Sequence, residues 1–206
     1  MIFWNAGEVK VDRVHGEVIV RRRNNIEEKS DYHDYKDDLV KDFKNICGYC
    51  GKNRKFFYDK FEIDHFIPQK KYPQFKNNYN NLVLSCQICN RHKSDDWPTN
   101  NPEVYHDNQK GYIDPATEDF DKTFYRDDDG NIVSNFEYGK YMIEKLKFNI
   151  RPIKLLWKLG KLHSTKELLR EKRNSDSITK DELEYLDNII IEIEELTEFL
   201  KYCEGE

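Results

Sequence analysis

The sequence predicts an α+β fold built around a small ββα unit that four cysteines clamp. Two Cys-x-x-Cys pairs, Cys47 with Cys50 and Cys86 with Cys89, frame two short apolar runs. Residues 8–23 alternate apolar and polar side chains about a His-Gly turn, which predicts an N-terminal β-hairpin. The last third of the chain repeats apolar residues at helical spacing, so we expect a helical C-terminal region.

The chain of 206 residues is long enough for one compact domain, or for a small core with an appended helical tail. Only 37% of its residues are hydrophobic, but Phe, Tyr and Trp make up 14%. Because aromatic side chains bury large areas, they compensate for few aliphatic ones. We divide the chain into an N-terminal hairpin and helix (1–46), the ββα core (47–97), a loop and β-hairpin extension (98–134) and a helical C-terminal region (135–206).

Local signals predict the elements around the core. Residues 32–43 repeat apolar side chains at helical spacing, which predicts a helix leading into Cys47 with Ser30 or Asp31 as its N-cap. Within the core we expect a strand in 55–67, a strand at 80–86 and a helix at the second cysteine pair; two prolines exclude a regular helix between the strands.

Later segments give equally local signals. An Asp-Gly turn within residues 123–135 predicts a second hairpin. We expect helices over 137–149 and after Pro152, and Thr179 with Glu182 has the spacing of a capping box that opens a last helix.

The formal charge of −5 hides a strong asymmetry along the chain. Residues 47–100 hold nine Lys and Arg against five Asp and Glu, and residues 151–173 hold eight against two. Residues 174–206 hold two against eleven. An acidic tail therefore masks a basic middle, and the mean charge is a poor guide to partners.

The sequence predicts a cytoplasmic protein that does not enter the membrane. No apolar run approaches the ~18–20 residues that span a bilayer, and charged residues interrupt the N-terminus before any signal-peptide core. In a reducing compartment, paired cysteines indicate a metal site before they indicate disulfides.

The four cysteines predict a structural Zn²⁺ site. Thiolates in two Cys-x-x-Cys pairs chelate tetrahedral Zn²⁺ from two sides. The 35 residues between Cys50 and Cys86 allow a two-stranded excursion and return. Four unrelated buried cysteines are the less favoured alternative. Such a closed site stabilises a fold and does not react, so the chemistry must lie in the residues between the pairs.

The residues between the pairs carry a second pattern. "CGYC" is followed by "IDHFIP" and then by "YNNLVLSCQICNRHK". In this order and spacing, residues 47–97 resemble the zinc-bearing form of the HNH, or ββα-metal, nuclease motif. The resemblance covers about a quarter of the chain. It implies a ββα-metal fold and metal-dependent hydrolysis of phosphodiester bonds.

Four residues match the motif. His65 matches the general base, and a neutral imidazole suits that role because its unperturbed pKa is about 6.5. Asp64 and Asn90 offer hard oxygen ligands to a catalytic Mg²⁺ or Mn²⁺. The resemblance implies that Asn81, rather than its neighbour Asn80, ties the loop between the strands and orients His65.

The sequence departs from the motif at its third letter, which is usually His and is Asn90 here. Oxygen ligation still suits Mg²⁺ but disfavours tight Zn²⁺ or Ni²⁺ binding there. His92 is a candidate replacement, yet two residues turn a helix by ~200°, so we expect it to face away from Asn90. Alone, Asp64 and Asn81 would be ordinary turn residues and His65 a surface histidine; together they favour a nuclease.

Basic residues near the motif predict contacts to DNA phosphates. Lys70 and Lys71 lie in the loop between the two expected strands, and Arg91 and Lys93 lie on the following helix. Phosphate contacts carry no sequence information by themselves, so low intrinsic specificity is expected. The basic stretch 151–173 is a second possible surface. Residues 21–23, all Arg, form a third, or only an exposed strand end.

The wider layout, with "IDHFIPQKKYP", "CNRHKSDDWP" and "GYIDPATEDFD", is similar to small bacterial HNH proteins of anti-phage systems, including Septu-type nucleases paired with an ATPase. This similarity implies the nuclease effector of a bacterial defence system. An ATPase partner would dock on the acidic C-terminal helices, whose apolar stripe equally permits core packing. The alternative is a non-catalytic, zinc-stabilised module that binds nucleic acid or docks a partner. An RNA substrate and single-strand nicking remain open.

Overall fold

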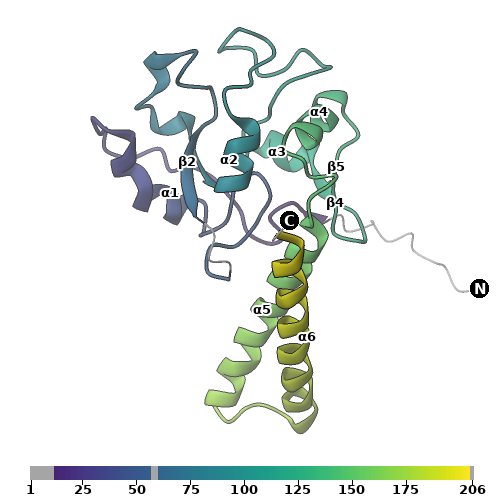
Figure 1. Cartoon of the computed structure of the whole chain (residues 1–206). Coiled ribbons are helices and arrows are strands. Elements are labelled where there is room, and N and C mark those ends of the chain that lie inside the picture. Colours follow the sequence, from purple (N-terminus) through teal and green to yellow (C-terminus); the bar gives the residue numbers. More distant parts are fainter. Residues whose placement is uncertain (1–11, 57–59, 205–206) are drawn as a thin grey trace, which may run out of the picture.

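The computed structural model describes residues 12–56 and 60–204, the last four of these by their backbone alone. Within these residues it is an α+β protein with two small sheets (Figure 1). In chain order the elements are β1 (Asp12–Arg13), the 3₁₀ helix η1 (Tyr32–Tyr35), α1 (Lys36–Asp42), β2 (Phe61–His65), the 3₁₀ helices η2 (Pro73–Phe75) and η3 (Tyr79–Asn81), β3 (Leu82–Cys86), α2 (Gln87–Lys93), α3 (Glu118–Thr123), β4 (Tyr125–Arg126), β5 (Ile132–Val133), α4 (Glu137–Lys145), α5 (Ile153–Asn174) and α6 (Lys180–Glu204).

The predicted ββα unit is present. β2 and β3 pair antiparallel, with Asp64 opposite Val83 and His65 opposite Leu82. Every residue of β3 is buried, because α1 packs against this strand and α2 folds back over the sheet. A strand covered on both faces needs a continuous apolar run, which the sequence supplies there. The predicted N-cap Asp31 accepts a hydrogen bond from the backbone of His33 and starts η1, which runs directly into α1.

The predicted N-terminal hairpin is wrong in the part that the structure describes; its residues 8–11 lie outside that part. Only Asp12 and Arg13 form a strand, and this strand pairs with β4. Gly16 makes the expected turn with φ of +65°, but the chain then continues without strand pairing. Carboxylates of other elements hold it instead, through the ion pairs Arg21–Asp121, Arg22–Asp114 and Arg23–Asp42. The three arginines therefore have structural partners and do not form a strand end, and a binding patch there stays a prediction.

The second predicted hairpin is confirmed, with β4 and β5 paired around an Asp-Gly turn. Gly130 in this turn has φ of +88°, which favours glycine. A Cβ atom on Gly130 or on Gly16 would lie 2.7 or 2.8 Å from the ring of Trp157. Trp157 of α5 therefore packs directly on the backbone of both turns.

Arg126 of β4 joins this hairpin to the first cysteine pair. Its buried guanidinium donates to the carbonyls of Val14, Gly130 and Cys50, and it lies 4.2 Å from the centre of the Trp157 ring. Burial lowers its pKa to about 10. This buried cation thus connects the hairpin to the turn that carries the first cysteine pair.

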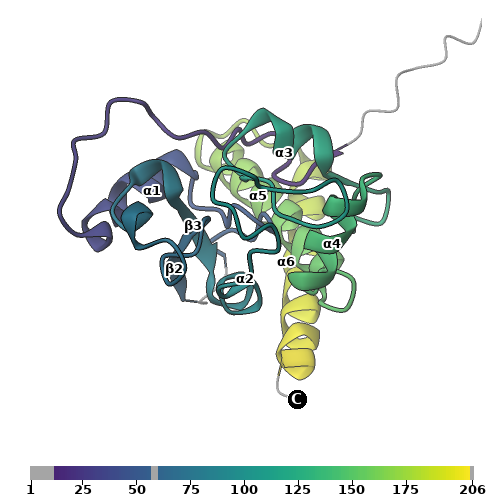
Figure 2. The same ribbon diagram turned by 90° about the horizontal axis from the view of Figure 1, so that it is seen from above.

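Helices α5 and α6, which we call the arm, pack against each other as a hairpin that projects from the rest of the molecule (Figure 1). Seen from above, α1, β2 and α2 lie on one side of the molecule and α4 on the other (Figure 2). The capping box is confirmed, since the Thr179 backbone donates to the Glu182 carboxylate and the Glu182 backbone donates to the Thr179 hydroxyl.

One cluster of buried apolar side chains extends from Val14 to Leu200. The division of the chain into four parts therefore remains a prediction. Among the described residues, no helix combines the length and the apolar character that crossing a bilayer requires.

Candidate active site

The four predicted zinc ligands meet in one buried cluster. Cys47 and Cys50 lie in a turn after α1, Cys86 ends β3, and Cys89 lies in α2; their sulfur atoms are all within 4.8 Å of one another. Zn–S bonds of ~2.3 Å in a tetrahedron separate the sulfur atoms by roughly 3.8 Å. The sulfur atoms of Cys50 and Cys86 are 3.9 Å apart, which is far longer than a disulfide bond. The cluster therefore fits Zn²⁺.

A cationic side chain lies against the cysteine cluster. Burial raises the pKa of the Cys47 and Cys89 thiols, whereas hydrogen bonds from the neighbouring thiols lower the pKa of Cys50. Arg151, which precedes α5, places its Nη1 atom 3.2 Å from the sulfur of Cys89. Burial opposes its charge, but the nearby cysteines raise the pKa of Arg151. This residue belongs to the stretch that we considered for DNA, and it lies against the cysteine cluster instead.

His65 ends β2 with its imidazole fixed by a backbone carbonyl. Its Nε2 atom lies 2.8 Å from the Lys76 carbonyl oxygen, which only accepts, so Nε2 carries the proton. The Tyr32 ring stands edge-on to the imidazole, 4.6 Å between centres. Burial lowers the pKa of His65. The imidazole is therefore neutral near pH 7, with the lone pair on Nδ1.

Asn81 holds the loop between the two strands. Its Oδ1 atom accepts from the backbone N–H of Ile67 at 2.7 Å, and its Nδ2 atom donates to the carbonyls of Ile67 and Phe75. The Asn81 carbonyl accepts from the backbone of Phe66. The amide thus fastens the segment that directly follows His65, which is the geometry that the resemblance implies.

The structure corrects the prediction for Lys93. We expected Lys93 to contact phosphates from the helix surface, but its side chain is completely buried. Its ammonium donates to the His65 carbonyl at 2.8 Å and lies 3.3 Å from Oδ2 of Asp64. The reason is its position on the face of α2 that packs on β2, where the buried Asp64 carboxylate needs a cation.

Asn90 lies three residues before Lys93, on the same face of α2. Its Nδ2 atom donates to Glu62 at 2.6 Å, and Gln87 donates to the same carboxylate at 2.9 Å. Burial opposes ionisation of Glu62, yet these hydrogen bonds lower its pKa. Glu62 and Asp64 alternate along β2, so both face the helix. The helix therefore brings Asn90 over the strand face that bears Asp64.

The donors on this face are suited to a hard divalent cation. Asp64 offers a carboxylate oxygen, and Asn90 keeps its amide oxygen because its nitrogen is bound to Glu62. Mg²⁺ and Mn²⁺ prefer such oxygen donors. The side chains present thus fit the ion that the sequence predicts.

The remaining predicted contact residues are on the surface. Lys70 is 81% exposed and pairs with Asp95, while Lys71 and Arg91 are exposed as well. His92 is exposed and does not join Asn90, as the helical geometry predicted. In the basic stretch of α5, three lysines form ion pairs with carboxylates of other elements: Lys158–Glu192, Lys161–Asp12 and Lys172–Glu182. Three of its cations are thus engaged within the protein, and a DNA-binding role for the stretch stays a prediction.

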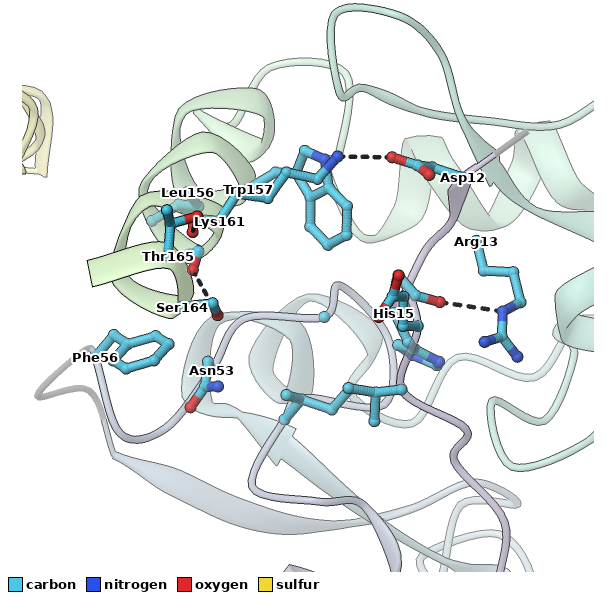
Figure 3. A pocket seen from close by; sticks show the side chains of 16 residues that line it. Asp12, Arg13, His15, Asn53, Phe56, Leu156, Trp157, Lys161, Ser164 and Thr165 are labelled. Carbon is cyan, nitrogen blue, oxygen red and sulfur yellow. Dashed lines mark hydrogen bonds and ion pairs between the residues drawn. The ribbon is translucent and has the colours of Figure 1, made fainter. Parts of the chain in front are cut away.

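A cavity of about 590 Å³ lies elsewhere, between the turn after β1 and helix α5 (Figure 3). Its lining includes His15, Asn53 and Trp157, and Lys161 reaches across it to Asp12 at 2.7 Å. None of the predicted site residues lines this cavity. A polymeric substrate lies along the surface of a protein and does not need an enclosed cavity. The candidate active site is therefore defined by its side chains and not by this cavity.

Comparison with known proteins agrees with this geometry. Residues 47–96 match the family model described as HNH endonuclease. This part of the chain is therefore an HNH endonuclease domain, the domain of a class of enzymes that hydrolyse phosphodiester bonds. No solved structure matches the chain.

Two relatives are similar over part of their length. The Septu protein PtuB of Bacillus thuringiensis is 34% identical over 70 residues, which are 32% of this chain and 27% of that protein. Protein ea31 of Escherichia phage lambda is 30% identical over 91 residues, which are 44% of this chain and 27% of that protein. The chain thus spans about a quarter of the length of the relatives that it matches.

Three side chains at the site were not predicted from the sequence. Glu62 was detectable, because it alternates with Asp64 on one strand face. Tyr49 donates a hydrogen bond to Asp64; it lies between Cys47 and Cys50, and the metal-binding pattern concerns only those two cysteines. Tyr32 approaches His65 from a segment about thirty residues upstream, and a contact of that separation has no local signal.

Proposed function

We propose that this protein is an endonuclease that hydrolyses phosphodiester bonds of DNA, with His65 as the general base. The orientation of the imidazole is the observation that carries the proposal. Nε2 is bound to the Lys76 carbonyl, so Nδ1 is left as the acceptor, and burial keeps the ring neutral by lowering its pKa. A base needs both properties near neutral pH.

In the proposed reaction Nδ1 of His65 takes a proton from the attacking water. The water oxygen forms a new bond to phosphorus, and the bond from phosphorus to the leaving sugar oxygen breaks. Asp64 and Asn90 would hold Mg²⁺ or Mn²⁺, which supplies neutralisation of the charge on the phosphate and the leaving oxygen. Asn81 keeps the segment after His65 in place.

DNA is the proposed substrate, and the exposed residues Lys70, Lys71 and Arg91 are the proposed phosphate contacts. These side chains border the strand and helix that carry Asp64 and Asn90. Binding through such contacts depends on salt and carries little sequence information.

The test is cleavage of supercoiled plasmid with Mg²⁺ or Mn²⁺, at equal zinc content in every variant. We expect His65→Ala to lose about 10²–10⁴-fold in rate, the usual contribution of a general base. His163→Ala is the matched control, since burial also lowers the pKa of this histidine but it lies on α5. Equal cleavage by wild type and His65→Ala would refute the assignment of the base. DNA binding without any cleavage would favour the non-catalytic module.

A narrower proposal is that the chain is the nuclease effector of a bacterial anti-phage system. It rests on the motif layout and on 34% identity to a Septu protein over part of the chain. The test is the plating efficiency of phage on two kinds of cells. Cells that express the chain together with its neighbouring genes should resist phage, and cells that express His65→Ala in the same context should not. Equal plating on both would reject the defence role.

An ATPase partner would dock on the arm. The arm projects from the molecule, and α6 exposes Tyr185, Ile191 and Phe199 among acidic side chains. Exposed apolar groups with charge around them are typical of protein interfaces. Co-purification of the partner with wild type, and its loss with Ile191→Glu, would support this docking; retention by the variant would exclude this face.

A further inference from the structure

The first cysteine pair contacts the catalytic carboxylate through the residue between its cysteines. Tyr49 of "CGYC" is completely buried, and its hydroxyl donates to Oδ2 of Asp64 at 2.5 Å. Asp64 is only 4% exposed. A residue of the zinc turn therefore makes a direct hydrogen bond to the proposed ligand of the catalytic cation.

A second donor binds the same oxygen. The Lys93 ammonium lies 3.3 Å from Oδ2 and also donates to the His65 carbonyl. The described residues form no hydrogen bond to Oδ1 of Asp64, and Oδ1 is not among their fully buried, unpartnered atoms. One oxygen of the carboxylate is thus held by two donors, whereas the other receives no hydrogen bond from the described residues and is not completely buried.

The position of Tyr49 is set by the backbone around it. The N–H of Gly48 donates to the Leu84 carbonyl in β3 at 2.9 Å. A Cβ atom on Gly48 would lie 2.6 Å from the Phe43 ring and 3.0 Å from Val83. The turn therefore lies flat on β3, the strand that pairs with the one bearing Asp64, and Tyr49 has little freedom to move.

We propose that Tyr49 is a positioning residue that couples the zinc site to the catalytic cation. By holding Oδ2, its hydroxyl keeps Oδ1 of Asp64 directed outward for the divalent cation. The zinc turn then does more than stabilise the fold, because it also sets the orientation of a ligand in the active site. This inference rests on the proposed function, since it assigns Asp64 to the catalytic cation.

The test is Mn²⁺ binding by zinc-loaded protein without DNA, measured by electron paramagnetic resonance of free Mn²⁺. We expect Tyr49→Phe to keep one zinc ion per chain and to weaken Mn²⁺ binding by about 10–100-fold, the usual effect of losing a hydrogen bond to a metal ligand. Plasmid cleavage by this variant should need correspondingly more Mn²⁺. The matched control is Tyr79→Phe, because Tyr79 donates to the buried Asp42 at 2.6 Å, outside the site.

Four outcomes would overturn the inference. Wild-type Mn²⁺ affinity in Tyr49→Phe would show that the hydroxyl does not position Asp64, and the proposed function would stand if the wild type still cleaves. Equal weakening in Tyr79→Phe, or loss of zinc from Tyr49→Phe, would show a merely structural role. A wild type that binds no Mn²⁺ and cuts no DNA would refute the proposed function, and the inference with it.

Discussion

The candidate active site and the arm are stabilised by opposite means. At the site, Asp64, His65 and Asn81 are at most 6% exposed, and each is held by hydrogen bonds to neighbouring groups. In the arm, an apolar stripe joins the two helices, and their ion pairs lie at the surface. Tyr185 and Ile191 are more than half exposed.

This difference follows from what each region has to do. Buried polar groups are costly unless each finds a partner, but once paired they fix one geometry, which catalysis requires. The ββα unit is too small to hold these polar groups rigidly by a large apolar core. The cysteine cluster supplies the additional stabilisation that a small unit needs. The arm bears no site residue, so a stripe of aliphatic contacts is sufficient and its outer face is free to carry contacts with other molecules.

The largest expected effect is the removal of zinc from the ββα unit. Cys86→Ser replaces a thiolate by a poor ligand at the junction of β3 and α2. Because structural zinc contributes on the order of 10 kcal/mol in small metal-stabilised folds, we expect loss of bound zinc, loss of cooperative unfolding and no cleavage. Zinc content and circular dichroism during thermal unfolding measure this.

Cys203→Ser is the control for that change, since it alters the chain's fifth cysteine, which belongs to neither Cys-x-x-Cys pair. It should retain zinc and cleavage. A Cys86→Ser protein that unfolds like the wild type would contradict the view that the site depends on the metal for its rigidity.

The ββα unit could be predicted from the sequence because each of its signals is local. The spacing of the cysteines, the apolar run of β3 and the order of Asp64, His65, Asn81 and Asn90 are all contained in about fifty residues. The arm was equally predictable, since helical periodicity and the capping box need only neighbouring residues.

The errors concern residues whose partners are far away in the sequence. The alternation in residues 8–23 suggested a self-paired hairpin, but β1 pairs with a strand over a hundred residues later. Lys93 was expected on the surface because lysine is rarely buried, but it is buried beside the Asp64 carboxylate of β2, which its ammonium pairs. A local pattern gives no information on such long-range charge pairing.

The pH dependence of cleavage is an effect of intermediate size. It should depend on His65 of the active site and not on His163 of the arm. A general base must be neutral, and burial lowers the pKa of His65 below its ordinary 6.5. As the pH rises through this pKa the imidazole loses its proton, so the rate should rise and then level off, with its midpoint below pH 6.5. Below the midpoint, the rate should fall about tenfold per pH unit.

His163→Ala should leave this profile unchanged, because His163 lies on the arm although burial lowers its pKa in the same direction. A profile with its midpoint above pH 6.5, or one that changes with His163, would contradict the assignment of the base.

The smallest expected effect is at the start of α6. In Thr179→Ala the hydroxyl that accepts from the Glu182 backbone is lost, which costs about 1 kcal/mol at a helix N-cap. We expect a lower temperature of thermal unfolding with unchanged cleavage and zinc content. Thr165→Ala, in the middle of α5, is the control; alanine favours a helix interior, so this change should be neutral or slightly stabilising. If Thr179→Ala lowered the cleavage rate of the folded protein as well, the arm would have to contribute to the geometry of the site, and the separation between a rigid catalytic region and an independent arm would fail.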